Sequence, residues 1–238
     1  MRVLAVDTAT PRVGAVYLDT ESGLAVERSE LDPRRHAELL TPLITQVLSE
    51  AGRSVADLDL IVTGVGPGPY TGLRVSVVTA TTLGMALGVP VVGVCTLDGF
   101  AYDAVRTDAR AVVVASDARR REVYWAAYDD TGRRIDGPMV HKPDVVAARY
   151  EYEVVGSAAS HVREQALDSD LRVGALADVA VAALAAGATI PTSPADMQWS
   201  EQGGDGAGSV PLNTLLMPRP LYMRHPDAQV PLALRGTQ

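Results

Sequence analysis

VLAVDTATPRVGAVYLDTESG, residues 3–23, and VVVASDARRREVYWAAYDDTG, residues 112–132, repeat one plan within a chain of 238 residues. Each stretch is an apolar strand pattern that ends in an aspartate, then a turn, a second strand pattern that also ends in an aspartate, and a turn that closes on a glycine. Asp7 aligns with Asp117 in this comparison. Self-similarity of this kind indicates that one structural unit has been duplicated.

Around the first copy the patterns alternate between strand and helix. Three strand patterns form a meander, and the helix that follows has apolar residues at three- and four-residue spacing. The strands are predicted at residues 3–7, 13–19, 24–30, 58–65 and 89–94, and the helices around Leu39 to Leu48 and at 70–87 and 97–105. Because a strand, a crossover helix and a strand imply parallel pairing beside the antiparallel meander, we expect a mixed sheet.

The second copy continues less regularly. A strand is predicted at residues 153–156 and helices near 158–167 and 175–186, whereas 191–210 is polar, rich in glycine and expected to be a flexible insert. Two β-β-β-α-β-α halves with an aspartate after each first strand resemble the superfold of actin, Hsp70 and sugar kinases. The expected fold class is therefore α/β, with two duplicated actin-like (ribonuclease H-like) lobes, each a mixed sheet with flanking helices, and a degenerate second lobe. We expect the first lobe to span 1–106 and the second 107–238.

Composition narrows the functional classes. The formal net charge is −8, which argues against the chain alone binding a nucleic-acid backbone. The uncharged run 75–97 is interrupted by glycines and Pro90, so we expect no membrane span. No signal-peptide pattern precedes Asp7, and the single cysteine, Cys95, agrees with a reducing compartment, so we expect a cytoplasmic protein.

The glycine-rich stretch GVGPGPYTGLR, residues 64–74, looks like a phosphate-binding loop but lacks the groups that such a loop needs. A P-loop requires a lysine, and the one lysine of the chain is Lys142. Pro67 and Pro69 each remove a backbone N–H donor from the loop. The sequence therefore predicts no phosphate site here and no cofactor.

The turns after the two first strands also differ from those of nucleotide-binding relatives. That superfold usually has a glycine two residues after the aspartate, where the backbone approaches the phosphates. Here Asp7, Thr8 and Ala9 form one turn, and Asp117 is followed by Ala118 and an arginine. We interpret both as degenerate nucleotide loops. The aspartates either hold magnesium or are turn residues that bind nearby amides, and the sequence leaves both alternatives open.

The predicted helix 70–87 carries a ridge of small residues at every fourth position, namely Gly72, Ser76, Ala80 and Gly84. Such a ridge lets another helix approach closely. Because the flanking positions are apolar as well, the helix must be covered on several sides. One hypothesis is that a partner chain packs on the ridge together with Leu39, Leu43 and Val47 of the preceding helix. The alternative is that the chain's own sheet and that helix provide the cover.

The motifs GPGPYTGLR, LAVDTAT, RRHAELLTPLI, VVASDARRREVY and PLYMR together resemble the TsaB (YeaZ) family of bacterial proteins. This resemblance implies a non-catalytic subunit required to form N6-threonylcarbamoyladenosine in tRNA, next to the anticodon. It also implies binding to a catalytic TsaD-like subunit and a TsaE-like ATPase, self-dimerisation through the same two helices, and contact with tRNA only through the complex.

The TsaD relatives have a metal-binding His-x-x-x-His pair, but the corresponding positions here are Thr96 and Phe100. Neither side chain replaces an imidazole ligand. We therefore expect no metal site and no catalytic residue. Two other hypotheses stay open, namely an active kinase or ATPase of the superfold with Asp7 and Asp117 on magnesium-nucleotide, and a homodimeric module that serves a different assembly.

Overall fold

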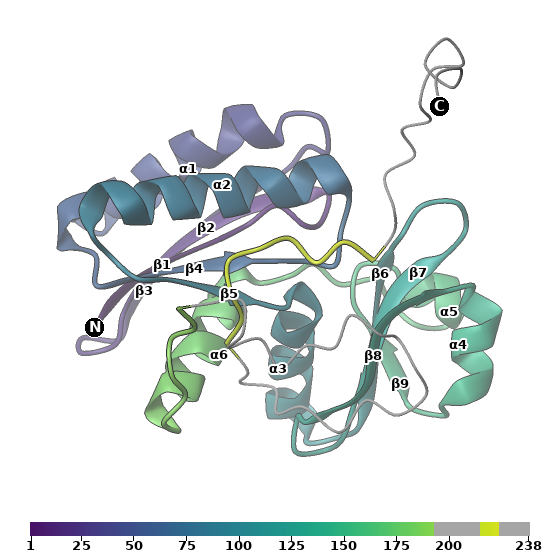
Figure 1. Ribbon diagram of the computed structural model, residues 1–238. Coiled ribbons are helices and arrows are strands. Elements are labelled where there is room, and N and C mark those ends of the chain that lie inside the picture. Colours follow the sequence, from purple (N-terminus) through teal and green to yellow (C-terminus); the bar gives the residue numbers. More distant parts are fainter. Residues whose placement is uncertain (193–214, 224–238) are drawn as a thin grey trace, which may run out of the picture.

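A computed structural model describes residues 1–192 and 215–223 (Figure 1). Its two sheets have the strand orders β3-β2-β1-β4-β5 and β8-β7-β6-β9. The strands of the first sheet are β1 (Arg2–Asp7), β2 (Arg12–Asp19), β3 (Leu24–Leu31), β4 (Leu60–Gly64) and β5 (Val91–Val94). Those of the second are β6 (Val112–Asp117), β7 (Val123–Tyr128), β8 (Arg134–His141) and β9 (Glu153–Val155).

Both sheets are mixed, and both follow the duplicated plan. β1 pairs antiparallel with β2 and parallel with β4, and β6 pairs antiparallel with β7 and parallel with β9. The two lobes of the predicted α/β fold are confirmed. The parallel pairs arise where a helix carries the chain back between successive strands, as the crossover rule requires.

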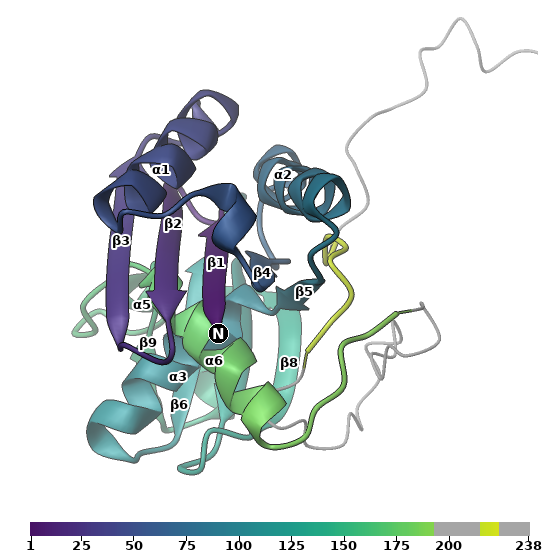
Figure 2. The same ribbon diagram turned by 90° about the vertical axis from the view of Figure 1, so that its left-hand side faces the viewer.

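Helices α1 (His36–Glu50) and α2 (Tyr70–Leu87) cover one face of the first sheet, and a short 3-10 turn, η1 (Val55–Asp57), follows α1 (Figure 2). Their contact with the sheet is an apolar cluster. Within α1 every residue of the predicted apolar face is buried, and this set is Leu39, Leu40, Leu43, Ile44, Val47 and Leu48. The amphipathic pattern of this segment therefore predicted the correct buried face.

In the second lobe the local patterns did not locate two elements, β8 and helix α4 (Pro143–Arg149), although the duplicated β-β-β-α-β-α plan includes a third strand and a helix there. Gly137 and Pro138 interrupt β8, and both residues usually weaken a strand prediction. α4 has 7 residues, too few for its periodicity to be distinctive. The next helix, α5 (Ala159–Val162), has 4 residues and is shorter than predicted. Both helices lie on the face of the second sheet that points away from the first lobe (Figure 1).

Two helices fill the space between the sheets, α3 (Thr96–Asp108) and α6 (Val173–Ala185). They share one apolar cluster with both sheets. Although α6 follows the second sheet in the sequence, it packs on the first sheet, where the carboxylate of Glu27 accepts hydrogen bonds from the amides of Val173 (2.7 Å) and Gly174 (3.0 Å). Carboxylates commonly stabilise the first turn of a helix in this way.

The C-terminal segment also lies on the first sheet. Leu216 forms an antiparallel bridge with Gly93, and the amide of Leu221 donates to the carbonyl of Val65 at 2.7 Å. The expected second lobe, 107–238, therefore includes two segments that the structure places on the first sheet, because the free edge of β5 and the face opposite α1 and α2 require cover. Most of the expected insert, residues 193–210, lies outside the described residues.

Across residues 1–192 and 215–223, the helices are all too short or too polar to traverse a lipid bilayer.

Candidate functional site

The turn after β1 is built around a buried aspartate. Asp7 is 1% exposed. Its Oδ1 accepts a hydrogen bond from the amide of Ala9 and its Oδ2 accepts one from the hydroxyl of Thr96, both at 2.8 Å. Burial raises the pKa of Asp7 to about 6, because desolvation disfavours the charged form more than these hydrogen bonds favour it. Both oxygens of Asp7 are therefore bound by the chain itself.

The turn after β6 repeats this arrangement with a more exposed aspartate. The amide of Arg119 donates to Oδ1 of Asp117 at 2.7 Å, and the guanidinium of Arg119 lies 3.5 Å from Oδ2. In both turns the aspartate binds the amide two residues further along the chain, which is the usual role of aspartate in a turn. These hydrogen bonds are those of turn residues, one of the two roles that the sequence allows.

The glycine-rich loop before α2 lies directly on the first of these turns. A Cβ atom at Gly68 would lie 2.3 Å from the carbonyl oxygen of Ala9, and one at Gly72 would lie 2.4 Å from that of Thr8. The Thr8 hydroxyl donates to the carbonyl of Gly72 at 2.6 Å and accepts from the amide of Ser76 at 3.0 Å. These glycines therefore allow two segments of backbone to come together.

A small cavity lies between the two turns. A cavity of about 10 Å³ is lined by residues of both, including Thr10, Pro69 and Asp117, and the hydroxyl of Tyr124 donates to the carbonyl of Gly68 at 3.4 Å across the lobes. A cavity of this volume holds at most about one water molecule. A nucleotide between the lobes would require them to move apart.

Each duplicated unit ends in a hydroxyl residue with the same hydrogen bonds, and the sequence did not predict this correspondence. In the first lobe Thr96 accepts from the amide of Gly66 at 3.2 Å, and its own amide donates to the carbonyl of Gly66 at 2.8 Å. In the second lobe Ser169 forms the same two bonds with Gly156, at 3.1 Å and 3.0 Å. The repeat of 3–23 at 112–132 does not reach these positions, and only the hydrogen bonds reveal the correspondence.

Thr96 and Phe100 occupy the start of α3, where the resemblance suggested comparison with a metal-binding pair. The Thr96 hydroxyl is engaged with Asp7, and Phe100 is a buried member of the apolar cluster between the sheets. Within the described parts of the chain, no three histidine, cysteine, aspartate or glutamate side chains gather as ligands for a metal ion.

The small-residue ridge of α2 faces the chain's own sheet, which corrects the interpretation of these residues as partner contacts. Gly72, Ser76, Ala80 and Gly84 are all buried. A Cβ at Gly84 would lie 2.2 Å from a side-chain atom of Val91. The absence of larger side chains at the ridge positions therefore lets α2 approach β5 and the first turn. Leu39, Leu43 and Val47 are buried as well, in the cluster between α1, α2 and the sheet. These side chains cover the sheet in the isolated chain, so they are not available as the outer surface of an interface.

Replacing Ala80 by tryptophan is therefore expected to destabilise the fold itself. Ala80 is 1% exposed, and overpacking a buried position commonly costs about 1–3 kcal/mol. Urea unfolding with circular dichroism measures the loss, and Thr82→Trp, at an exposed position of the same helix, is the control. If Ala80→Trp were as stable as the unmodified chain, Ala80 and the ridge would have to lie on the molecular surface instead.

The opposite side of α2 is exposed and partly apolar. Tyr70, Val78 and Met85 point away from the sheet, with Val78 58% and Met85 85% exposed. At the start of the helix the ring of Tyr70 stacks on that of Tyr222 at 4.7 Å, and the guanidinium of Arg74 donates to the Tyr222 hydroxyl at 3.0 Å. Tyr70, Val78 and Met85 are large apolar side chains on the outer side of the helix, and we refer to them as the exposed α2 face.

Comparisons with known proteins agree with this architecture. The family model described as TsaD, tRNA N6-adenosine threonylcarbamoyltransferase, matches residues 30–189, more than half of the chain. An uncharacterized protein of Mycobacterium tuberculosis is 47% identical over 140 residues, which are 58% of this chain and 64% of that protein. The chain thus matches slightly less than two thirds of that relative's length.

Two further relatives have more informative names. The tRNA threonylcarbamoyladenosine biosynthesis protein TsaB of Escherichia coli is 35% identical over 156 residues, 63% of this chain and 67% of that protein. The solved structure of YeaZ from Pseudomonas aeruginosa superposes with a TM-score of 0.69 at 28% identity, covering 93% of this chain and 99% of that one. Another solved structure from the same organism, described as similar to peptidase YEAZ, gives 0.68 at 29% identity. The duplicated fold, the turns and these matches lead to one conclusion: the chain belongs to the TsaB (YeaZ) family.

Proposed function

We propose that this chain is a non-catalytic subunit required to form N6-threonylcarbamoyladenosine in tRNA, next to the anticodon, and that it binds and stabilises a TsaD-type catalytic subunit. The name of the Escherichia coli relative supports the pathway. The observation that carries the non-catalytic role is the small size of the cavity between the two turns, about 10 Å³, beside which Asp7 is bound by Ala9 and Thr96.

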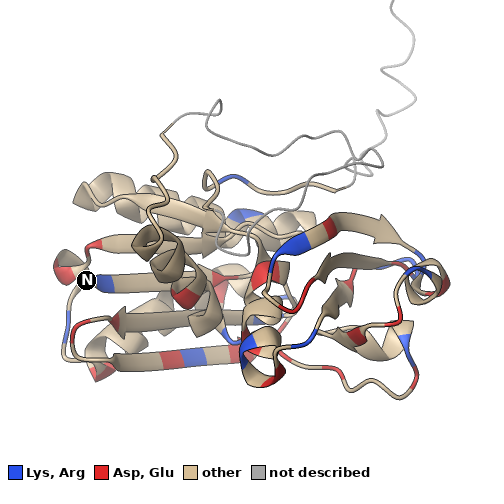
Figure 3. Ribbon diagram, turned by 90° about the horizontal axis from the view of Figure 1, so that it is seen from below, with Lys and Arg blue, Asp and Glu red and all other residues tan. Residues whose placement is uncertain are grey.

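The exposed α2 face is the proposed surface for the catalytic partner. An apolar stripe on an otherwise packed helix is typical of a surface that another chain covers. The same face serves a homodimer when the partner is absent, and a TsaE-type ATPase joins the complex. Acidic and basic residues are interspersed over both lobes (Figure 3) and the net charge is −8, so tRNA is bound through the complex.

The role is tested by purifying the chain with a TsaD relative from the source cell and assaying tRNA modification with and without the chain. We expect modification to require the chain, and the chain alone to bind no ATP. Micromolar binding or hydrolysis of ATP by the purified chain would favour an active enzyme of the superfold. A chain that copurifies with no TsaD relative would favour a homodimeric module of another assembly.

The proposed surface is tested by Met85→Glu, which should weaken binding to the catalytic partner at least about tenfold, because it places a charge in an apolar contact. Met85 is 85% exposed, so the stability of the isolated chain should change little. The matched control is Val145→Glu, an exposed apolar position on α4 in the other lobe. Titration calorimetry with both variants measures the affinities, and equal binding by Met85→Glu and the unmodified chain would exclude this face.

A further inference from the structure

The second sheet has no counterpart of β5 among the described residues. In the first sheet β4 lies between β1 and β5, whereas in the second sheet β9 is at the edge. The difference follows from the helices that precede these positions. α2, with 18 residues, carries the chain far enough for β5 to run back beside β4. α5 has 4 residues, and the hydrogen bonds from Ser160 to Asp168 turn the chain back at once.

The missing strand leaves uncovered the residues that correspond to core positions of the first lobe. Val3 pairs with Leu60, and the equivalent Val112 pairs with Glu153. Leu60 is fully buried, but the side chain of Glu153 is 50% exposed. Two positions further along β9, Val155 is only partly buried. Within residues 1–192 and 215–223, the outer edge of β9 is thus open where the first lobe has a fifth strand.

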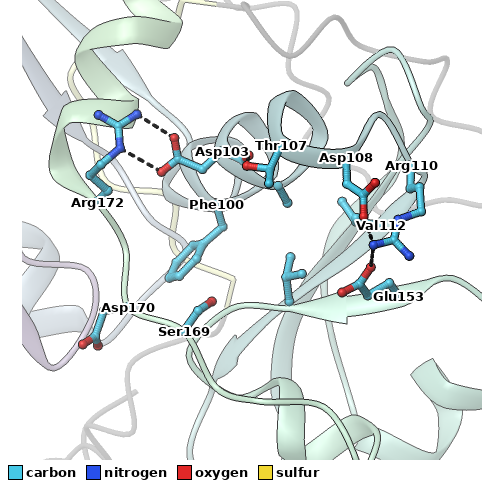
Figure 4. A pocket seen from close by; sticks show the side chains of 12 residues that line it. Phe100, Asp103, Thr107, Asp108, Arg110, Val112, Glu153, Ser169, Asp170 and Arg172 are labelled. Atoms are coloured by element: carbon cyan, nitrogen blue, oxygen red, sulfur yellow. Dashed lines mark hydrogen bonds and ion pairs between the residues drawn. The ribbon is translucent and has the colours of Figure 1, made fainter.

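A groove of about 320 Å³ lies at this place, between α3, the start of β6, β9 and the residues before α6 (Figure 4). Its middle is apolar and includes Phe100, Val112 and Val155. Figure 4 shows two clusters of ion pairs at opposite ends of the groove, with Phe100 between them. An apolar floor between polar ends is the usual composition of a binding groove, and this volume is at the lower end of the common range.

Both end clusters carry an excess of negative charge. At one end Arg172 is bound by Asp103 at 2.6 Å and Asp178 at 2.8 Å. At the other end Arg110 is bound by both Asp108 and, at 3.2 Å, Glu153. Each cluster pairs one guanidinium with two carboxylates, and three of these carboxylates, Asp103, Asp108 and Glu153, line the groove. Asp170, which also lines the groove, is paired with Arg12 at 2.5 Å.

We propose that this groove binds an extended segment of a partner protein, apolar in its centre and basic at both ends, which adds as a fifth strand along the free edge of β9. An edge strand offers backbone N–H and C=O groups to an added strand, and side chains of alternate residues determine specificity. Residues i, i+2 and i+4 of such a segment share one face, so a Lys-x-Val-x-Lys pattern places its valine over Phe100 and a lysine toward each acidic cluster. This surface is separate from the exposed α2 face, which lies on the far side of the first sheet.

The probe is the peptide acetyl-Lys-Thr-Val-Thr-Lys-amide, titrated into the full chain and followed by NMR chemical shifts. We expect saturable binding that weakens with added salt and shifts of the amides of β9 and α3. The charge-reversed peptide acetyl-Glu-Thr-Val-Thr-Glu-amide should bind at least about tenfold more weakly, because its ends meet the excess carboxylates.

Two variants locate the site. Ala104→Trp fills the groove from α3, and Glu153→Lys reverses one charge at an exposed position that leaves the core intact. Each should reduce the affinity for the lysine peptide at least about tenfold. Ala148→Trp, an exposed position of α4 on the opposite face of the same lobe, should leave it unchanged.

Several outcomes overturn the proposal. They are no saturable binding of the lysine peptide up to about 1 mM, equal affinity for the two peptides, or unchanged affinity in both Ala104→Trp and Glu153→Lys. If sedimentation instead shows that the chain self-associates and that Glu153→Lys abolishes this, the occupant is a second copy and the partner segment is excluded.

Discussion

Replacing Arg134 by methionine is expected to destabilise the protein by about 3–5 kcal/mol, because the change leaves a buried carboxylate without its counter-charge. Arg134 on β8 and Asp98 on α3 are both 1% exposed in their side chains, and their nearest charged atoms are 3.6 Å apart. The hydroxyl of Tyr128 on β7 donates to the same carboxylate at 2.7 Å. This group therefore connects α3 to the second sheet in the buried interior.

The electrostatic balance at this pair explains the size of the effect. Burial raises the pKa of Asp98, and the charge of Arg134 opposes that shift. Methionine replaces much of the arginine's apolar volume but removes the charge, so Asp98 must either stay ionised in an apolar site or take up a proton. The loss of stability should consequently become smaller as the pH is lowered and Asp98 is protonated.

Chemical denaturation of the full chain gives the free energy of unfolding and so tests this prediction. Arg133→Met is the matched control, because the neighbouring arginine is exposed and a surface change of this kind typically alters stability by no more than about 0.5 kcal/mol. The double variant Asp98→Asn/Arg134→Met should recover part of the loss, since both charges are then absent. A loss below about 1 kcal/mol for Arg134→Met would show that the pair contributes little.

The second large effect concerns the pH dependence of stability at Asp7. The pKa of Asp7 is about 6 in the folded chain, whereas the ordinary value for an aspartate, which applies to the unfolded chain, is 3.8, so folding takes up a proton between these values. Stability from this group is therefore present at low pH and is lost as the pH rises through about 6. A shift of about two pKa units corresponds to about 3 kcal/mol over the whole range.

Asp7→Asn removes this titration while it keeps an oxygen that accepts from Ala9. The free energy of unfolding of the variant, relative to the unmodified chain, should rise by about 2 kcal/mol between pH 4 and pH 7, which is most of the full effect. Asp98 titrates in both proteins, so its contribution cancels when their free energies of unfolding are subtracted. Unfolding curves in guanidinium chloride at a series of pH values provide the measurement.

Asp19→Asn is the control for Asp7→Asn, with an expected change of the opposite sign. The amide of Glu21 donates to the Asp19 carboxylate at 3.0 Å and lowers its pKa. The ionised Asp19 carboxylate therefore stabilises the folded chain at pH values above the pKa of an ordinary aspartate, and this stabilisation is lost as the pH falls. Asp19→Asn should accordingly become less stable, relative to the unmodified chain, as the pH rises. A pH-independent difference for Asp7→Asn would contradict the buried, desolvated state of Asp7.

The local patterns of the chain predicted the first lobe well and the second less well. The apolar spacing of α1 identified its buried face because a periodic stripe requires only one sheet to cover it. In the second lobe β8 contains Gly137 and Pro138, and α5 has 4 residues, so neither gives a clear periodic signal. The residues that form the open edge of β9 were consequently not recognised.

The α2 ridge shows the limit of pattern reading at the candidate site. Small residues at every fourth position indicate a close approach, but they do not say which neighbour approaches. Gly72 contacts the turn at Thr8, and Gly84 contacts Val91, both within the chain. The exposed residues Val78 and Met85 fall between these positions, and they became recognisable as a surface only when α2 was placed on the sheet.

The sequence by itself determined the duplication, the mixed sheets and the absence of a P-loop lysine, because these depend on residue type and on spacing along one strand or helix. Tertiary structure decided how the groups are used: Asp7 binds Ala9 and Thr96, Asp98 pairs with Arg134, and β9 lacks a neighbour on its outer side within the described residues. Burial and hydrogen bonding join residues that are far apart in the chain, and the energies that they change cannot be read from local periodicity.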